Sequence, residues 1–100
     1  AGHSRDIITA KVAALNKALT DPALVAILSE SGNDTVADEM STLLADTSTL
    51  LAQLPQDLAQ ATPKQQKSLY EKLTQLTQII KHQLMPTLEV QVGFNSTDGD

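Results

Sequence analysis

The sequence predicts an all-α protein, an up-down bundle of about four helices followed by an extended C-terminal tail. Leucine, isoleucine and valine recur at helical spacing through most of the chain. Prolines and short polar side chains separate these stretches at the places where helices begin and end. Only Tyr70 and Phe94 are aromatic, so the core must be aliphatic. A chain of 100 residues fits a single domain.

The first helix is expected at about residues 4–19, with Ser4 as N-cap. The residues before it, Ala1, Gly2 and His3, are interpreted as a remnant of cloning or cleavage. A short second helix at about residues 22–29 has Asp21 as N-cap and Pro22 at its first position. The inner stripe of the first helix comprises Ile7, Ile8, Val12, Leu15 and Leu19.

A third helix is expected at about residues 35–53, with Asp34 as its cap and Pro55 after its end. The connector at residues 56–61 is expected to hold one helical turn around Leu58. The apolar stripe of the third helix comprises Val36, Met40, Leu43, Leu44, Thr47, Leu50, Leu51 and Leu54.

The run Thr62-Pro63-Lys64-Gln65 is the clearest helix start, because Thr62 and Gln65 have the spacing of a capping box. A fourth helix is expected at about residues 63–85, ended by Pro86. Beyond it, apolar residues alternate with polar ones, which predicts an extended segment. The bundle is therefore assigned to residues 4–86 and the extended tail to residues 87–100. The apolar face of the fourth helix comprises Leu69, Leu73, Leu76, Ile80 and Leu84.

Composition and charge exclude several classes of protein. The net charge of −5 and the scarcity of aromatic residues argue against nucleic-acid binding. Cysteine is absent, which excludes disulfides and thiolate chemistry. No apolar run approaches the roughly 18 residues of a transmembrane segment. Residues 18–63 contain seven acids and no base. We interpret these acids as dispersed over inner helices flanked by basic outer ones, in preference to an acidic surface for a cationic partner.

No catalytic, cofactor or metal site is predicted within the bundle. His82 has no carboxylate three or four residues away and is expected to face solvent near a helix end. His82 and Met85 project from one side of one helix, so they cannot hold opposite faces of a haem. Met40 and Met85 are expected to fill the core.

The last residues carry the most specific pattern in the chain. Asn95, Asp98 and Asp100 supply oxygen ligands suited to calcium or to capping a neighbouring helix. A flexible polar C-terminus is the simpler interpretation. Phe94 argues against that interpretation, because an aromatic side chain can hold the tail by burial.

The C-terminal run resembles the signature of the imelysin-like family, in which an apolar extended stretch precedes Gly-Phe-Asn, two variable residues and Asp-Gly-Asp. The match covers about a tenth of the chain, and the helices before it are compatible with the family without being specific to it. The matching residues are Gly93, Phe94, Asn95, Asp98, Gly99 and Asp100.

The resemblance implies an all-helical protein of the bacterial cell envelope, periplasmic or associated with the outer membrane, and often a lipoprotein held by a lipid anchor. It also implies a role in iron-regulated uptake, by binding rather than catalysis, with iron or another divalent metal held by the full-length protein. Members are several times longer, so the chain is expected to be a C-terminal domain or fragment. Its partner would be the N-terminal half of the same protein or a second copy.

Two alternatives remain open. One is a stand-alone helical module that binds another protein through its apolar stripes. The other is part of a metallopeptidase, which needs the family motif Gly-x-His-x-x-Glu in an N-terminal half, since this chain lacks that motif. For the tail, the hypothesis is that it folds against that half and shapes a pocket there.

Overall fold

The computed structural model describes residues 4–88, which form four α-helices joined by short connections. A 3-10 turn, η1 (Leu58–Gln60), precedes the last α-helix, and a π-helical turn, η2 (Ile80–Leu84), follows it directly. No strand occurs among the described residues, so the predicted all-α bundle is confirmed. The α-helices are α1 (Arg5–Leu19), α2 (Pro22–Glu30), α3 (Asp34–Ala52) and α4 (Pro63–Ile79).

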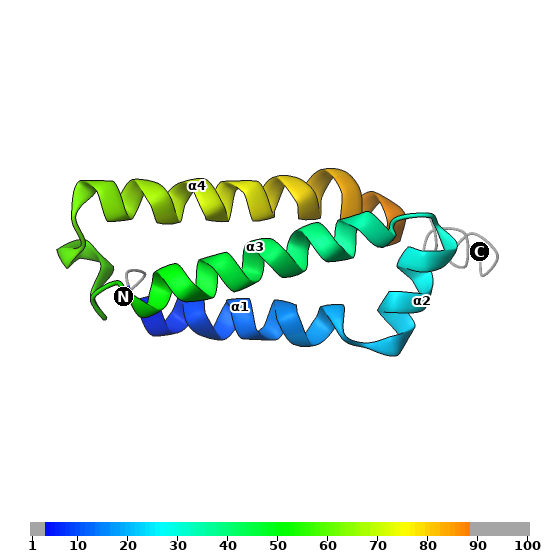
Figure 1. Ribbon diagram of the computed structural model, residues 1–100, viewed down its shortest axis with the longest axis horizontal. Helices are drawn as coiled ribbons and strands as arrows, with labels where there is room; N and C mark the ends of the chain where they lie inside the picture. Colours follow the sequence, from blue (N-terminus) through cyan, green and yellow to red (C-terminus); the bar gives the residue numbers. More distant parts are fainter. Residues whose placement is uncertain (1–3, 89–100) are drawn as a thin grey trace, which may run out of the picture.

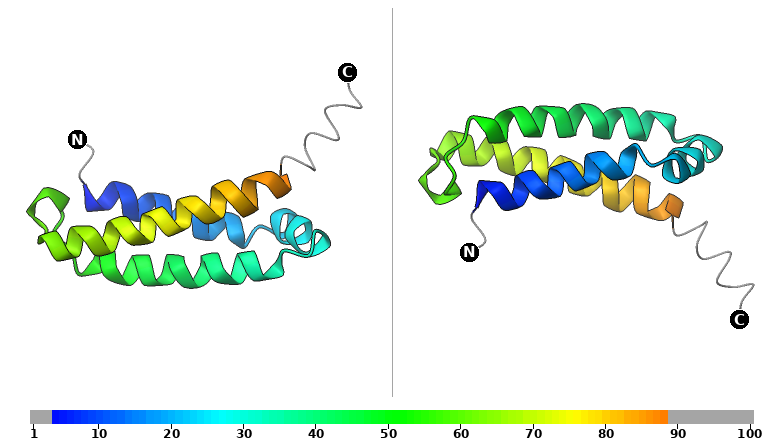
Figure 2. Two further views of the ribbon diagram at one scale, coloured as in Figure 1. Left: turned by 90° about the horizontal axis from the view of Figure 1, so that it is seen from above. Right: turned by 90° about the horizontal axis from the view of Figure 1, so that it is seen from below.

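The three long helices lie side by side, with α3 antiparallel to α1 and α4 (Figure 1). Helix α3 packs against each of the other three helices. In Figure 2, α1 and α4 both lie on the same side of α3, so the long helices have a triangular arrangement. The short helix α2 is bent by 65° from α1 and covers one end of the bundle. Helix α3 is therefore the central element of the fold.

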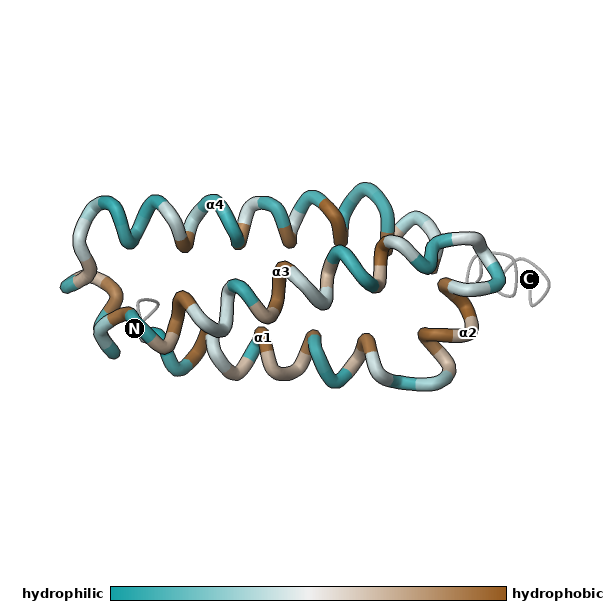
Figure 3. The backbone as a smooth tube through the Cα atoms, in the orientation of Figure 1, coloured by the Kyte–Doolittle hydropathy of each residue, from teal (hydrophilic) through white to brown (hydrophobic). Residues whose placement is uncertain are grey.

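The core is aliphatic, as predicted, and α3 contributes the largest share of it. Val36, Met40, Leu44 and Leu51 are between 0% and 2% exposed and recur at helical spacing. Hydrophobic segments of neighbouring helices face one another in Figure 3. Ile7, which the sequence placed on the inner stripe of the first helix, is instead 44% exposed. The remaining core residues are Val12, Leu19, Leu28, Leu54, Leu58, Ala61, Leu69, Leu76 and Leu84.

One polar side chain is fully buried among the described residues. Thr47 is 0% exposed, and its hydroxyl donates a hydrogen bond of 2.6 Å to the backbone carbonyl of Leu43, one turn earlier. This local bond satisfies the hydroxyl without a partner from another helix. Thr47 therefore takes its place in the apolar row of α3, as the sequence pattern predicted.

The predicted N-caps of α1, α2 and α4 are confirmed. Ser4 accepts a hydrogen bond from the backbone of Asp6, and Asp21 accepts one from Ala23. Thr62 and Gln65 form both bonds of the capping box. Each cap is decided by residues adjacent in sequence, which explains why it could be recognised without knowledge of the packing.

The predicted cap of α3 is wrong. Asp34 is the first residue of the helix, and Asn33 occupies the cap position without a side-chain cap bond. The amide of Asn33 instead donates a hydrogen bond of 2.9 Å to the hydroxyl of Thr87, which is 54 residues away. The tight turn before Asn33 is made by Gly32, whose φ of 74° is strained for residues with a Cβ. A tertiary contact therefore replaces the local cap here.

Pro86 does not end the last helix. The π-helical turn η2 precedes it, and residues 85–88 are again α-helical. A π-turn widens the backbone, which gives the proline ring room beside the preceding turn. The hydroxyl of Thr87 donates to the carbonyl of Gln83 at 2.9 Å, within the same turn. The predicted extended conformation is thus wrong for Thr87 and Leu88, and residues 89–100 lie outside the described residues.

Candidate binding surface

The site residues singled out in the sequence cannot be placed, because they all lie outside the described residues. They are Gly93, Phe94, Asn95, Asp98, Gly99 and Asp100. Their interpretation as a calcium ligand set, a helix cap or a pocket-shaping tail stays a prediction.

His82 lies in η2 and is exposed, as expected. Within residues 4–88, no group of three or more His, Asp or Glu side chains is arranged to hold a metal ion. The expectation for Met85 is wrong, since it is 44% exposed, whereas Met40 is completely buried as expected. The described donors therefore do not fit an iron site, and any such site would need ligands from elsewhere.

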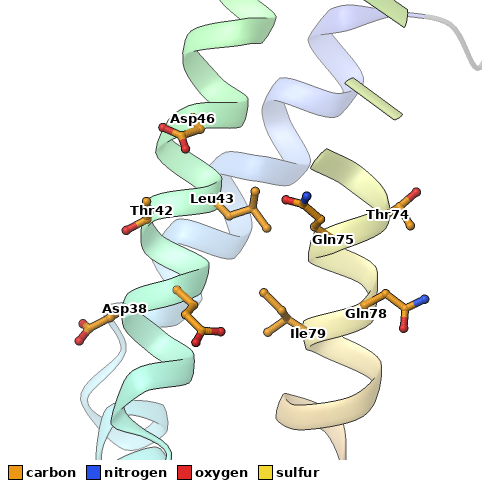
Figure 4. Close-up of a pocket in the computed structure, with 9 residues that line it drawn as sticks. Asp38, Thr42, Leu43, Asp46, Thr74, Gln75, Gln78 and Ile79 are labelled. Carbon is orange, nitrogen blue, oxygen red and sulfur yellow. The ribbon is translucent and has the colours of Figure 1, made fainter. Parts of the chain in front are cut away.

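A groove of about 660 Å³ runs between α3 and α4. Figure 4 shows Leu43 of α3 pointing toward α4, with Gln75 and Ile79 of α4 pointing back toward α3. Leu43 and Ile79 are half-buried and pack against the core. The complete lining comprises Asp38, Glu39, Thr42, Leu43, Asp46, Thr74, Gln75, Gln78 and Ile79. The groove has the size of a ligand or peptide site and an apolar floor.

The groove carries its charge on one side. Its three carboxylates, Asp38, Glu39 and Asp46, all come from α3 and are exposed, whereas the lining residues of α4 are uncharged. Figure 4 shows Asp38 and Asp46 on the outer side of α3, directed away from α4. The carboxylates therefore form a rim beside the floor rather than a cluster within it. Among the described residues, none of the three forms an ion pair.

The acidic helix α3 lies between α1 and α4, which together with η2 carry the lysines and arginines, as the sequence pattern indicated (Figure 1). Three of the acids line one side of the groove because Asp46 follows Glu39 by seven residues and Asp38 by eight, about two helical turns. Leu43 lies four residues after Glu39 and three before Asp46, so the sequence also places it beside these acids. What the sequence did not provide was the second wall, because Ile79 belonged to none of the predicted stripes.

A second hollow, of about 410 Å³, lies between η1 and α4. Its lining includes Leu58, Leu69 and Leu73, and Tyr70 stands at its edge with 72% of its surface exposed. The amide of Gln66, also in the lining, donates to the carbonyl oxygens of Leu58 and Ala61, at 3.3 and 3.2 Å. These bonds hold η1 against α4, so we interpret this hollow as part of the connection between helices.

The sequence matches no protein-family model and no curated protein at a significant level. A solved structure does match it: the crystal structure of an imelysin-like protein from Psychrobacter arcticum 273-4. The two are 59% identical over 87% of this chain, and the structures superpose with a TM-score of 0.78. The chain belongs to the imelysin-like family.

This imelysin-like chain spans 27% of the length of the Psychrobacter protein. The family resemblance inferred from the C-terminal run is thereby confirmed by a comparison covering most of the chain. Among the described residues, no single helix is both long and apolar enough to cross a membrane. Helices α1 and α2 meet those criteria only as a pair, across the 65° bend between them.

Proposed function

We propose that this chain is the helical-bundle portion of an imelysin-like protein of the bacterial cell envelope, associated with iron uptake and acting by binding. The 59% identity to the imelysin-like protein from Psychrobacter arcticum carries this proposal. Since the chain spans 27% of that protein, the proposal concerns the part of an imelysin-like protein that these residues form.

In this proposal, iron or another divalent metal is held by residues outside the described bundle. The bundle supplies a rigid wall, because α3 packs against the three other α-helices and its core row is fully buried. The family-motif residues of the tail, Asn95, Asp98 and Asp100 among them, help to shape a pocket against the N-terminal half. No catalytic role is assigned to this chain.

The proposal is tested in cells that carry the gene, grown with and without an iron chelator. An antibody raised against this chain is expected to detect an envelope-associated product heavier than 10.7 kDa whose amount rises under iron restriction. A product that is found in the cytoplasmic fraction, and whose amount is the same with and without the chelator, would contradict the envelope location and the uptake role.

The binding role is tested on the isolated native product by metal analysis and by a peptidase assay. We expect bound metal and no peptide hydrolysis. Replacing Asn95, Asp98 and Asp100 by alanine should lower metal content or stability if the tail shapes the pocket. If metal content and stability were both unchanged, the tail would have no role in shaping the pocket. Metal-dependent peptide hydrolysis would favour the peptidase alternative.

A further inference from the structure

The groove between α3 and α4 has the form of a helix-binding surface. Leu43 points toward α4 and Ile79 points toward α3, about one turn apart along the groove, and both are only half-buried by their own chain (Figure 4). An amphipathic helix binds to such a groove through apolar side chains that recur every three or four residues. The apolar floor therefore favours a helix as its occupant, and the rim indicates what charge that helix carries.

The rim selects a cationic partner. Asp38, Glu39 and Asp46 line one side, and no lysine or arginine lines either side. Complementary charge raises the association rate and fixes the orientation of a partner, while a like-charged helix is repelled. The rim lies entirely on α3, so a partner with lysines or arginines along one edge is bound in one orientation.

We propose that the α3–α4 groove binds a cationic amphipathic helix of a partner protein. Its apolar side chains rest on Leu43 and Ile79, and its basic side chains lie along the α3 rim. This interaction is independent of the proposed iron-uptake role, because it uses no residue of the tail and no metal.

The probe is a synthetic helical peptide of leucine and lysine, with leucines at positions i, i+3, i+4 and i+7. A peptide with glutamate in place of every lysine is its control. In titrations followed by NMR, the lysine peptide is expected to shift the methyl signals of Leu43 and Ile79, whereas the glutamate peptide leaves them unchanged. Binding should weaken as salt is raised, because exposed charges are screened.

Two charge-matched variants separate the groove from the net charge of the chain. The triple variant D38N/E39Q/D46N should weaken binding about tenfold, the combined effect of three exposed ion pairs. The control variant E30Q/D34N/E71Q removes the same charge from exposed positions that do not line the groove. It should retain the affinity of the parent within about twofold. Thermal melts establish that both variants are folded.

Three results would overturn the proposal. Equal weakening by both variants would show that the peptide responds to net charge alone. Signal shifts centred on residues away from Leu43 and Ile79 would place the peptide elsewhere. A concentration-dependent dimer that protects the Leu43 methyls without peptide would assign the groove to a second copy of the chain. None of these results bears on iron uptake or on localisation.

Discussion

The guanidinium of Arg5 donates a hydrogen bond of 2.9 Å to the carbonyl oxygen of Leu54, 49 residues further along the chain. The backbone N–H of Arg5 also donates to the carbonyl of Gln56, at 2.8 Å, and Ser4 pairs with Asp57 in an isolated antiparallel bridge. These polar contacts tie the start of α1 to the chain just after α3. They hold the first turn of α1, where Ile7 is 44% exposed, and the buried side chains of Val12 and Leu19 hold the rest of the helix.

Replacing Arg5 by alanine should lower the free energy of unfolding by about 1–2 kcal/mol, because a charge-assisted hydrogen bond to a partly buried carbonyl is lost. The change is measured by urea denaturation. Lys11→Ala is the matched control, since Lys11 lies on the same helix and is exposed. Equal effects of the two substitutions would contradict a role for the Arg5 contact.

Replacing Thr62 by alanine should lower the free energy of unfolding by about 0.5–2 kcal/mol, because the first turn of α4 loses its side-chain acceptor. The reciprocal variant Gln65→Ala removes the other bond of the capping box. Since the two bonds form one unit, the double variant should cost less than the sum of the single ones. Thermal and urea unfolding of all four proteins provides the measurement, and strict additivity would show that the two bonds act independently.

Replacing Leu44 by alanine should lower the free energy of unfolding by about 2–5 kcal/mol, because Leu44 is completely buried at the centre of α3 and the shorter side chain leaves a cavity. Tyr70→Ala removes a larger side chain, but one that is 72% exposed, and should change stability much less. Urea midpoints of the two variants decide the comparison. A larger loss at Tyr70 would mean that the hollow beside η1 contributes more to stability than its exposure indicates.

The helix starts could be predicted because each depends on side chains within three residues of one another. Ser4, Asp21 and Thr62 cap helices through local geometry that the packing leaves unchanged. Asp34 fails as a cap because its neighbour Asn33 is held by a residue distant in sequence. Pro86 does not end the last helix, because the π-turn before it accommodates the proline ring. The residue pattern gives no signal that predicts this π-turn.

The candidate surface was less accessible to sequence reasoning than the fold. The sequence assigned Leu43 to the core stripe, and Leu43 does pack against the core. The sequence did not show that Leu43 also lines the floor of a groove. Ile79 fell between the predicted stripes. The shape of a groove between two helices depends on how the helices are rotated and packed against each other. The spacing of apolar residues within one helix does not give this rotation. The family motif, by contrast, was recognised from contiguous residues alone.

The bond between Asn33 and Thr87 should couple the turn before α3 to the end of the last helix. Asn33→Ala removes the donor, and Thr87→Val removes the acceptor together with the hydroxyl bond to Gln83. Each variant should lose about 1 kcal/mol of stability.

The double-mutant cycle isolates the shared bond, and we expect a coupling of about 0.5–1.5 kcal/mol. Thr77→Val is the control for Thr87→Val, because Thr77 also bonds to the carbonyl four residues earlier but has no long-range partner among residues 4–88. Its cycle with Asn33→Ala should show no coupling. If both cycles gave the same value, the loss of stability at Thr87 would reflect helix propensity rather than the bond that joins the turn before α3 to the end of the last helix.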